Sequence, residues 1–281
     1  MANFYFGSTA VITTKHEKDI LLAPAFREVG IELQLANLDT DQLGTFSGEI
    51  KRIDSQRETA VKKARLGMQS TGIKIGLASE GSIGADPLVP LLFSNIECLA
   101  WVDDLLGFDL VEFYRSFEIK TFYAEFSSDD SIDALMDSIQ ASNDLSRNAL
   151  IVRTKDPADS VIKGINDIRK LRSAILSISK TFDFAVIESD FRAHFSESRR
   201  NNISRCANRL IARLKSNCPT CDIPGFGHKR FTVGLPCQYC GQEVTNFVSG
   251  EVIGCVKCGY EIEKSNGLTE ADPGSCKDCN P

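Results

Sequence analysis

The pattern of hydrophobic and polar positions predicts short strands that alternate with helices over the first 215 residues. Apolar or alternating runs typical of strands fall at residues 10–14, 31–36, 73–78, 94–102, 110–126, 149–153 and 184–188. Helical patterns fall at residues 16–29, 56–68, 131–140, 159–178 and 196–215. Such alternation is typical of an α/β domain, so we expect a mixed central sheet flanked by helices.

Capping residues and a proline indicate where two of these helices begin, end or bend. Ser55 precedes the second helix and Glu58 follows three residues later, which is a capping-box pattern. Gly67 fits the C-terminal region of that helix. Pro24 falls inside the first helix, where a proline is expected to kink or break it.

Two polar segments predict loops. Residues 38–49 are rich in turn residues, as in loops that carry function on a rigid scaffold. Residues 79–84 (Ser-Glu-Gly-Ser-Ile-Gly) are expected to end the strand that precedes them. The long strand expected at residues 110–126 carries four phenylalanines for a core, namely Phe113, Phe117, Phe122 and Phe126.

Size, charge and composition narrow the class of protein. The chain has 281 residues with 42% hydrophobic and 25% charged content, which suits one large core with a small appendage. The formal net charge of -6 argues against bulk electrostatic binding to nucleic acid. No run approaches the roughly 18 apolar residues of a membrane span, and the first residues lack the pattern of a secretory signal. The expected location is the cytoplasm, with no membrane partner.

The composition changes near Cys218, and four Cys-x-x-Cys pairs follow. We therefore expect an α/β domain at residues 1–215 and a small zinc-ribbon-like module at residues 216–281. The pairs are Cys218/Cys221, Cys237/Cys240, Cys255/Cys258 and Cys276/Cys279. Two such turns supply the four thiolates of a tetrahedral zinc site, so two structural Zn²⁺ ions are expected. Disulfides or an iron–sulfur cluster are the alternatives.

Spacing alone does not decide how these Cys-x-x-Cys turns, or knuckles, pair in the two sites. Nested pairing joins the two middle pairs in one site and the outer pairs in another, and we favour it. Sequential pairing, first with second and third with fourth, is the alternative. Gly241 and Gly259 directly follow two of the pairs, where a positive φ turns backbone amides toward the thiolates. Cys98 and Cys206 fall outside the pattern and are expected to be buried hydrophobes.

The module is expected to depend on its metal. Residues 216–281 hold few large apolar side chains, so metal binding would supply the folding free energy, roughly 10–16 kcal/mol per site in peptides. Four cysteine ligands leave no open position for a substrate, so no catalysis is expected at zinc. Five basic against eight acidic residues in this region favour a docking or lid role over binding to a phosphate backbone.

Three segments of the larger domain concentrate polar groups at the ends of expected elements. The first holds Thr13, Thr14, Lys15 and Lys18, between the first strand and the first helix. Hydroxyls, lysines and a helix N-terminus together favour a phosphate. The alternative is an ordinary capped helix with a solvated charged face.

The second set is acidic, and comprises Glu49, Glu58 and Glu80. A carboxylate at a strand end between glycines, like Glu80, can coordinate Mg²⁺ or orient a water molecule. The alternatives are the capping role for Glu58 and a solvated loop acid for Glu80.

The third set follows the last expected strand and comprises Asp190, Arg192 and His194, with Arg199 and Arg200 beyond. Arg192 could bind a phosphate through two hydrogen bonds, and His194 could contact a base or a phosphate. A helix-start ion pair with a packed histidine is the alternative.

Some of these residues carry a resemblance. The run Glu58-Thr-Ala-Val-Lys-Lys-Ala64 resembles the Glu-Asn-Ala-x-x-Lys-Ala helix of the inosine/xanthosine triphosphate pyrophosphatase (Maf-like) superfamily. Residues 75–83 are similar to the strand and acidic turn that follow in that superfamily. Thr13-x-x-x-x-Lys18 resembles its opening phosphate motif, and the order agrees over residues 10–84.

The resemblance implies hydrolysis of a nucleoside triphosphate to a monophosphate and pyrophosphate. It implies Mg²⁺ held by Glu58 and Glu80, and phosphates held by Lys18, Lys63 and Arg192. Arg192 and His194 would take the place of the late Ser-His-Arg of the superfamily.

The sequence departs from that superfamily at three positions. Lys15 and Thr59 stand where it carries asparagine, and Glu80 stands where some members carry paired aspartates. These departures bear on base recognition and on catalysis. The whole chain, with its Cys-Pro-x-Cys-x-x-Pro-Gly-Phe-Gly and terminal Cys-x-x-Cys-Asn-Pro runs, also resembles a bacterial family of unknown function.

Three functions therefore compete at the level of sequence. The first is a metal-dependent nucleotide pyrophosphohydrolase that acts on phosphoanhydride bonds. The second is a nucleotide-binding protein without turnover, and the third is a zinc-ribbon adaptor that contacts protein or nucleic acid. A nucleotide or another phosphorylated small molecule is the expected ligand, and a homodimer is compatible with the sequence.

Overall fold

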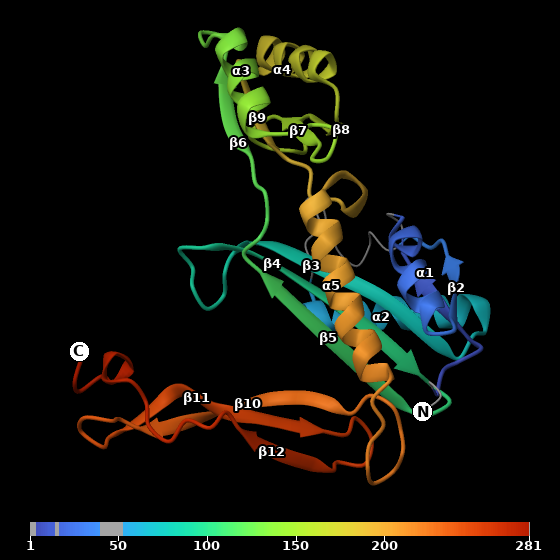
Figure 1. Cartoon of the computed structure of the whole chain (residues 1–281). Coiled ribbons are helices and arrows are strands. Elements are labelled where there is room, and N and C mark those ends of the chain that lie inside the picture. The colour runs from blue at the N-terminus through green and yellow to red at the C-terminus, as the bar shows by residue number, and fades with distance from the viewer. Residues whose placement is uncertain (1–3, 15–16, 40–52, 281) are drawn as a thin grey trace.

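The computed structural model of the chain describes residues 4–14, 17–39 and 53–280. Three sheets make up this part of the chain, with five, four and three strands. Figure 1 shows the five-stranded sheet in the middle, the four-stranded sheet with its helices at one end, and the three-stranded sheet at the other. Helix α5 (Glu197–Leu214) crosses the middle sheet toward the three-stranded one.

The five-stranded sheet has the order β2-β1-β3-β4-β5. Strands β1 and β2 are parallel, as are β1 and β3, whereas β3, β4 and β5 pair antiparallel. The sheet is therefore mixed, as the sequence predicts. Its strands are β1 (Ser8–Thr13), β2 (Ile31–Ala36), β3 (Ile75–Ala85), β4 (Phe93–Asp103) and β5 (Phe108–Ser116).

Helices cover both faces of this sheet. Helix α1 (Lys18–Glu28) and α5 pack on one face, over a core that includes Leu77 and Trp101. Helix α2 (Gln56–Thr71) packs on the other face against Ala78 and Val102. Successive residues of a strand point to opposite faces, so alternate positions of β3 and β4 face α2 or the pair α1 and α5.

Residues between β5 and α5 form a separate four-stranded sheet of order β6-β9-β7-β8. Two helices lie against it and bury a core of their own that includes Ile139 and Ile175. No helix of the described ranges is long and apolar enough to cross a membrane. The elements are β6 (Tyr123–Ser127), α3 (Ile132–Ser142), β7 (Leu150–Arg153), β8 (Val161–Ile165), α4 (Ile168–Phe182) and β9 (Phe184–Ser189).

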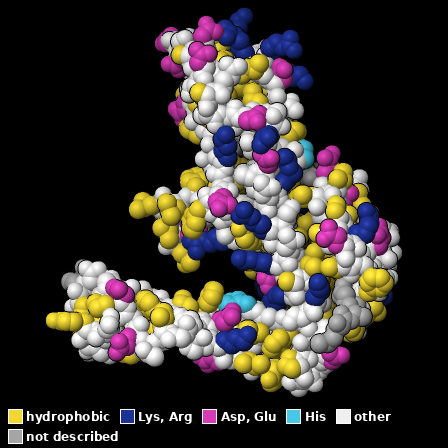
Figure 2. All heavy atoms as spheres, viewed as in Figure 1, with side chains coloured by type: hydrophobic (Ala, Val, Ile, Leu, Met, Phe, Trp, Pro, Cys, Tyr) yellow, Lys and Arg dark blue, Asp and Glu magenta, His cyan; other side chains and the backbone are white. Residues whose placement is uncertain are grey.

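The C-terminal residues form an antiparallel ribbon of order β10-β11-β12. It comprises β10 (Gly227–Pro236), β11 (Glu243–Gly254) and β12 (Glu261–Ser265). The ribbon projects from the body, and an open hollow lies between the two in the view of Figure 2.

Several expected elements are confirmed. The capping box of α2 forms, with the Ser55 side chain on the Glu58 amide and the Glu58 side chain on the Ser55 amide. The helix extends beyond Gly67 and ends at Gly72, whose φ of 76° is the left-handed conformation of a helix C-cap. In contrast, the break considered at Pro24 does not occur, because helix α1 runs through this residue. The isolated thiols of Cys98 and Cys206 are buried, as expected, and burial raises the pKa of both.

Three expectations are wrong because pairing between distant segments, which a local pattern does not report, decides where these strands begin and end. Residues 79–84 do not end a strand, since β3 continues through them in register with β4. The single strand expected at residues 110–126 is two strands, β5 and β6, in different sheets, and Phe113 and Phe117 are exposed. The helix expected at residues 159–178 begins later, because β8 occupies its first part and pairs with β7.

Candidate functional site

Eight cysteines gather into two groups of four at opposite ends of the ribbon. The near cluster, next to the body, is Cys218, Cys221, Cys255 and Cys258. The far cluster is Cys237, Cys240, Cys276 and Cys279. In each, the four sulfur atoms all lie within 4.8 Å of one another.

This alternating pairing, first knuckle with third and second with fourth, corrects both the nested and the sequential pairing. The reason is the strand between each knuckle and the next. Strand β11 has 12 residues, which span about 40 Å at the rise of an antiparallel strand, and it separates the second knuckle from the third. Consecutive knuckles therefore lie at opposite ends of the ribbon, and alternate knuckles share an end.

The sulfur geometry fits a tetrahedral metal ion. The Cys218–Cys258 and Cys221–Cys255 Sγ–Sγ distances are 3.7 and 3.6 Å, and Cys240–Cys276 is 3.6 Å. A zinc ion bound at about 2.3 Å from each sulfur requires tetrahedral edges of about 3.8 Å. A disulfide would require about 2.05 Å, so these sulfurs are not bonded in pairs. Each cluster could hold one metal ion such as zinc.

The backbone at each knuckle supports thiolate ligands. The amides of Thr220, Tyr239 and Lys257 donate to Cys218, Cys237 and Cys255 Sγ at 3.3–3.4 Å. Gly241 and Gly259 have φ values of 74° and 75°, as expected from the sequence. Hydrogen bonds from amides stabilise the charged form of a sulfur, so these turns favour metal binding.

A second feature lies at the carboxyl ends of β1 and β3. The chain leaves β1 through α1 on one face to reach β2, and returns through α2 on the other face to enter β3. This is a topological switch point, where open α/β sheets bind ligands outside the carboxyl ends of their strands. Strand β1 stops at Thr13 opposite Ala78, whereas β3 continues through Ser79 and Glu80.

On the face of α1 and α5, the Lys18 ammonium is buried beside β3. Its Nζ donates to Ser79 Oγ at 2.9 Å. Burial lowers the pKa of Lys18 from 10.5 to about 8; the Arg199 and Lys63 charges lower it further, and Glu97 and Glu80 oppose them. Glu17, the residue before α1, makes no side-chain hydrogen bond to the first turn of the helix.

On the opposite face, Lys63 of α2 forms an ion pair with Glu80. Both side chains are nearly buried, with 11% and 8% of their surface exposed. Glu80 occupies the strand position after Ser79, which explains why its side chain points to α2 and not to α1.

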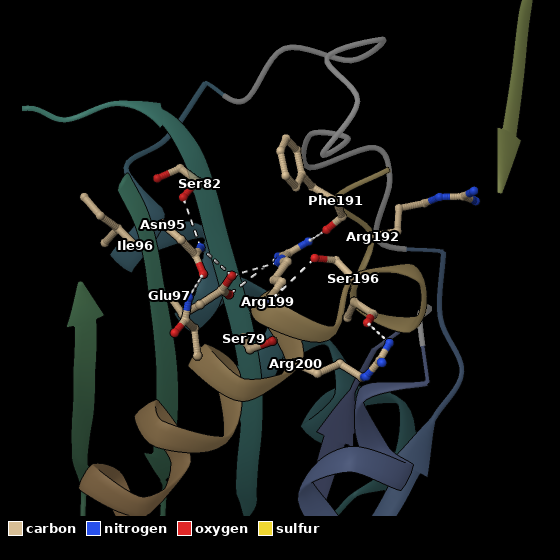
Figure 3. A network of polar contacts seen from close by, with 12 residues as sticks. Ser79, Ser82, Asn95, Ile96, Glu97, Phe191, Arg192, Ser196, Arg199 and Arg200 are labelled. Carbon is tan, nitrogen blue, oxygen red and sulfur yellow. Dashed lines mark hydrogen bonds and ion pairs between the residues drawn. The ribbon is translucent and has the colours of Figure 1, made fainter. Parts of the chain in front are cut away.

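A third buried pair joins α5 to β4. Arg199 Nε donates to Glu97 Oε1 at 2.7 Å, and the two side chains are 3% and 0% exposed. Arg199 Nη1 also donates to the Phe191 carbonyl at 2.6 Å. Figure 3 shows Arg199 between these two partners, with Asn95 on the far side of the carboxylate. Asn95 donates to Glu97 Oε1 at 2.8 Å and accepts from Asn202 at 2.8 Å.

Gly81 makes room for this pair. A Cβ atom there would lie 2.5 Å from Arg199 Nη2 and 2.5 Å from Glu97 Oε2. The glycine that suggested a turn is therefore required inside a strand, where two charged side chains cross the backbone.

We call Lys18, Lys63, Glu80, Glu97 and Arg199 the polar cluster. It carries one more positive than negative group when all five are ionised, and Lys18 donates to the neutral hydroxyl of Ser79. Buried charges are costly unless compensated, so an anion at this edge of the sheet would be favoured.

The other predicted site residues lie around this cluster in different settings. Thr13 and Thr14 are buried at the end of β1, and Thr13 Oγ1 lies against Gly67 of α2. The exposed Glu58 carboxylate accepts from the Ser55 amide and hydroxyl at 3.0 and 2.7 Å, which lowers its pKa. The structure thus uses Glu58 as a helix cap. Lys15 and Glu49 lie outside the described residues.

Arg192 and His194 lie where the chain passes from the four-stranded sheet to α5. Arg192 binds both carboxylate oxygens of Asp190, with Nη2–Oδ2 at 2.6 Å. Asp190 also accepts from the Gly164 amide, so the arginine helps hold β8 at this junction. Burial lowers the pKa of His194, and the Arg192 charge lowers it further. The structure brings together Lys18, Lys63 and Glu80, and places Arg192 in its own ion pair.

Sequence reasoning did not assign a site role to Glu97 or Arg199, although a signal existed. Glu97 alternates with Leu99 and Trp101 on the core face of β4. Arg199 falls on the helical face that carries Ile203 and Cys206 in the core. A charge in an apolar phase of a strand or helix indicates a buried partner or a site.

Comparison with known proteins identifies a family without an assigned activity. No curated protein matches the chain. One family's sequence model matches residues 63–281, which includes four members of the polar cluster and all eight clustered cysteines. The chain therefore belongs to the family described as Domain of unknown function (DUF6671).

Proposed function

We propose that this protein binds the phosphate groups of a nucleoside triphosphate at the carboxyl ends of β1 and β3, and hydrolyses it to a monophosphate and pyrophosphate. The observation that carries the proposal is the polar cluster, with its excess positive charge, at the topological switch point of the sheet. The resemblance of residues 10–84 to the inosine/xanthosine triphosphate pyrophosphatase superfamily supports the same ligand.

The residues have separate roles in this proposal. Lys18 and Arg199, on one face of β3, and Lys63, on the other, stabilise negative charge on phosphate oxygens as the α-phosphorus is attacked. When Lys63 turns from Glu80 to a phosphate, the Glu80 carboxylate can accept the proton of the attacking water. The new bond joins water oxygen to the α-phosphorus, the bond to the bridging oxygen breaks, and pyrophosphate leaves.

Magnesium enters this proposal with the substrate. Glu80 forms an ion pair with Lys63 and Glu97 forms one with Arg199, so this arrangement does not form a two-carboxylate metal site. Mg²⁺ is commonly held by one or two carboxylates together with substrate phosphates. It would neutralise phosphate charge.

The two cysteine clusters are proposed to hold structural zinc. Their sulfur geometry fits it, and four thiolates leave no open coordination position. The zinc ions would hold the ribbon together and take no part in hydrolysis.

The test is pyrophosphate release from a panel of nucleoside triphosphates, with and without Mg²⁺, by the wild type and Glu80→Gln. Loss of the proton acceptor is expected to lower the rate about 100-fold or more. Glu263→Gln, on the exposed strand β12, is the matched control and should keep the wild-type rate. A Glu80→Gln variant as fast as the wild type would refute the role of Glu80.

Nucleotide binding without turnover is the second candidate. It is favoured by the fact that both glutamates expected to hold a catalytic metal are engaged, Glu58 by Ser55 and Glu80 by Lys63. Tight binding with no product over hours in the same assay would establish it.

A further inference from the structure

The near cysteine cluster and the polar cluster lie at opposite ends of helix α5. Arg199 is in the first turn of the helix, and its last residue, Leu214, precedes Cys218 by four positions. Figure 1 shows the helix crossing the sheet toward the ribbon. Arg199 and Arg213 are 14 residue steps apart, which correspond to about 21 Å at the rise of an α-helix.

The near cluster is built into the main core of the protein. Ile223 follows the first knuckle and Val256 lies inside the third, and both pack against the core formed by the five-stranded sheet and α5. Lys257, also inside the third knuckle, donates from Nζ to the Gly107 carbonyl at 3.2 Å. The cysteines of the near cluster therefore position residues that form part of the main core.

The segment that follows the first knuckle fixes the carboxyl end of α5. Arg213 Nη2 donates to the Gly225 carbonyl at 2.9 Å, and its Nη1 donates to Glu112 of β5 at 2.9 Å. The Gly225 amide donates back to the Arg213 carbonyl at 3.0 Å. Gly225 has a φ of 102°, and a Cβ atom on it would lie 3.1 Å from Val256. The end of α5 and the near cluster thus share one packed contact.

The far cluster provides an internal comparison. It packs against Leu235, Val244, Phe247 and Ala271 of the ribbon. Within the described residues, the hydrogen bonds of its cysteines and their knuckle backbone stay inside the ribbon. The two clusters have the same four cysteine ligands. The near cluster joins the ribbon to the body, whereas the far cluster joins only parts of the ribbon.

We infer that a metal ion in the near cluster, and not in the far cluster, sustains the phosphate site through α5. Loss of that ion releases Ile223 and Val256 from the core and frees the carboxyl end of the helix. The helix carries Arg199 and Asn202 at its other end, where both are fixed by buried partners of β4. Its displacement removes one of the three cations that face the phosphates. This inference rests on the proposed phosphate site.

The experiment compares Cys218→Ser/Cys221→Ser with Cys276→Ser/Cys279→Ser in the full-length zinc-loaded protein. Zinc content, calorimetric binding of inorganic pyrophosphate, and hydrogen exchange of residues 199–214 are measured for each. Both variants should lose one zinc per chain. The near-cluster variant should bind pyrophosphate about tenfold or more weakly, as for loss of one charged contact, and its α5 amides should exchange faster. The far-cluster variant should match the wild type in both.

A second variant covers the case in which the near-cluster variant does not fold. Ile223→Ala/Val256→Ala keeps all eight cysteines and should keep two zinc ions, yet it should weaken pyrophosphate binding and speed exchange in α5. Unchanged affinity and exchange in the near-cluster or the alanine variant would overturn the inference and leave the phosphate site intact. If the wild type itself fails to bind pyrophosphate, the proposed function fails, and the exchange of α5 still decides the mechanical coupling.

Discussion

The buried pair of Arg199 and Glu97 occupies space that a side chain at position 81 would fill. Gly81 lies where any side chain would meet Arg199 and Glu97 at 2.5 Å. A buried ion pair depends strongly on geometry, because displacing one partner leaves the other charge uncompensated. The effect of a substitution at position 81 therefore tests whether the Arg199–Glu97 ion pair lies where the structure places it.

We predict that Gly81→Ala lowers the free energy of unfolding by about 1–3 kcal/mol through overpacking and weakens pyrophosphate binding. Gly84→Ala is the control, since a Cβ atom there meets nothing within 4 Å. Urea unfolding and calorimetric titration measure the two effects. Equal stability and affinity in the two variants would show that the pair does not occupy this space.

The lowered pKa of Lys18 predicts a pH dependence of ligand binding. Lys18 has a folded pKa of about 8 against 10.5 when unperturbed, so it is charged below pH 8 and loses its proton as the pH rises through 8. Pyrophosphate affinity should therefore fall above pH 8 in the wild type and in Lys62→Met. Lys18→Met should bind more weakly and lack this step. An identical pH profile in Lys18→Met would exclude Lys18 from the site.

The same group affects stability in the opposite sense. Between pH 8 and 10.5 Lys18 is neutral in the folded state and charged in the unfolded state, so the unfolded state binds more protons. The contribution of Lys18 to the free energy of unfolding therefore rises with pH across this window. The stability gained by Lys18→Met relative to the wild type should be largest below pH 8 and shrink toward pH 10.5.

At the scale of elements, substitutions at the start of α2 test whether Glu58 serves as a helix cap or as a metal ligand. Glu58→Gln should lower the melting temperature, because the carboxylate accepts two hydrogen bonds from Ser55. It should leave pyrophosphate affinity unchanged. Ser55→Ala should act on stability alone, and the double variant should be less destabilised than the sum of the two, since both remove the same interaction. A loss of pyrophosphate affinity in Glu58→Gln but not in Ser55→Ala would show that Glu58 takes part in the phosphate site.

The elements also show how far local sequence signals reach. The capping box, the strands at β1, β2 and β9, and the glycines of the zinc knuckles follow from local chemistry, and the structure confirms them. Residues 79–84 read as a turn because their glycines and serines favour turns locally, yet their long-range pairing with β4 makes them a strand. β8 was hidden in the same way, because its partner β7 is what makes it a strand.

The candidate site was only partly accessible from the sequence. Lys18, Lys63 and Glu80 were expected together from a resemblance, and the structure brings them to one edge of the sheet. The sequence names Arg199 only beyond the third polar set and does not point to Glu97, because the two residues are 102 positions apart and only the packing of α5 on β4 joins them. The pairing of the cysteine knuckles follows from the strand lengths between them, once the ribbon is known.

For the whole molecule, the separate cores predict a stepwise response to metal removal. The four-stranded sheet buries its own core, whereas the ribbon has a small apolar cluster around the far cysteines. A chelator should therefore remove protection from hydrogen exchange across residues 227–280 and leave residues 123–189 protected. Equal protection of the ribbon with and without chelator, in protein confirmed to be metal-free, would contradict a structural role for the metal.

Cations on three helices form one phosphate site in this proposal, and Lys63 can be compared with its neighbour Lys62 to test it. Lys63 is buried against Glu80, whereas Lys62 is half exposed and pairs with Asp54. The measurement is calorimetric titration of a non-hydrolysable nucleoside triphosphate into Lys63→Met and Lys62→Met. We expect wild-type affinity for Lys62→Met and about tenfold or more weaker binding for Lys63→Met. Equal affinities in the two variants would contradict it.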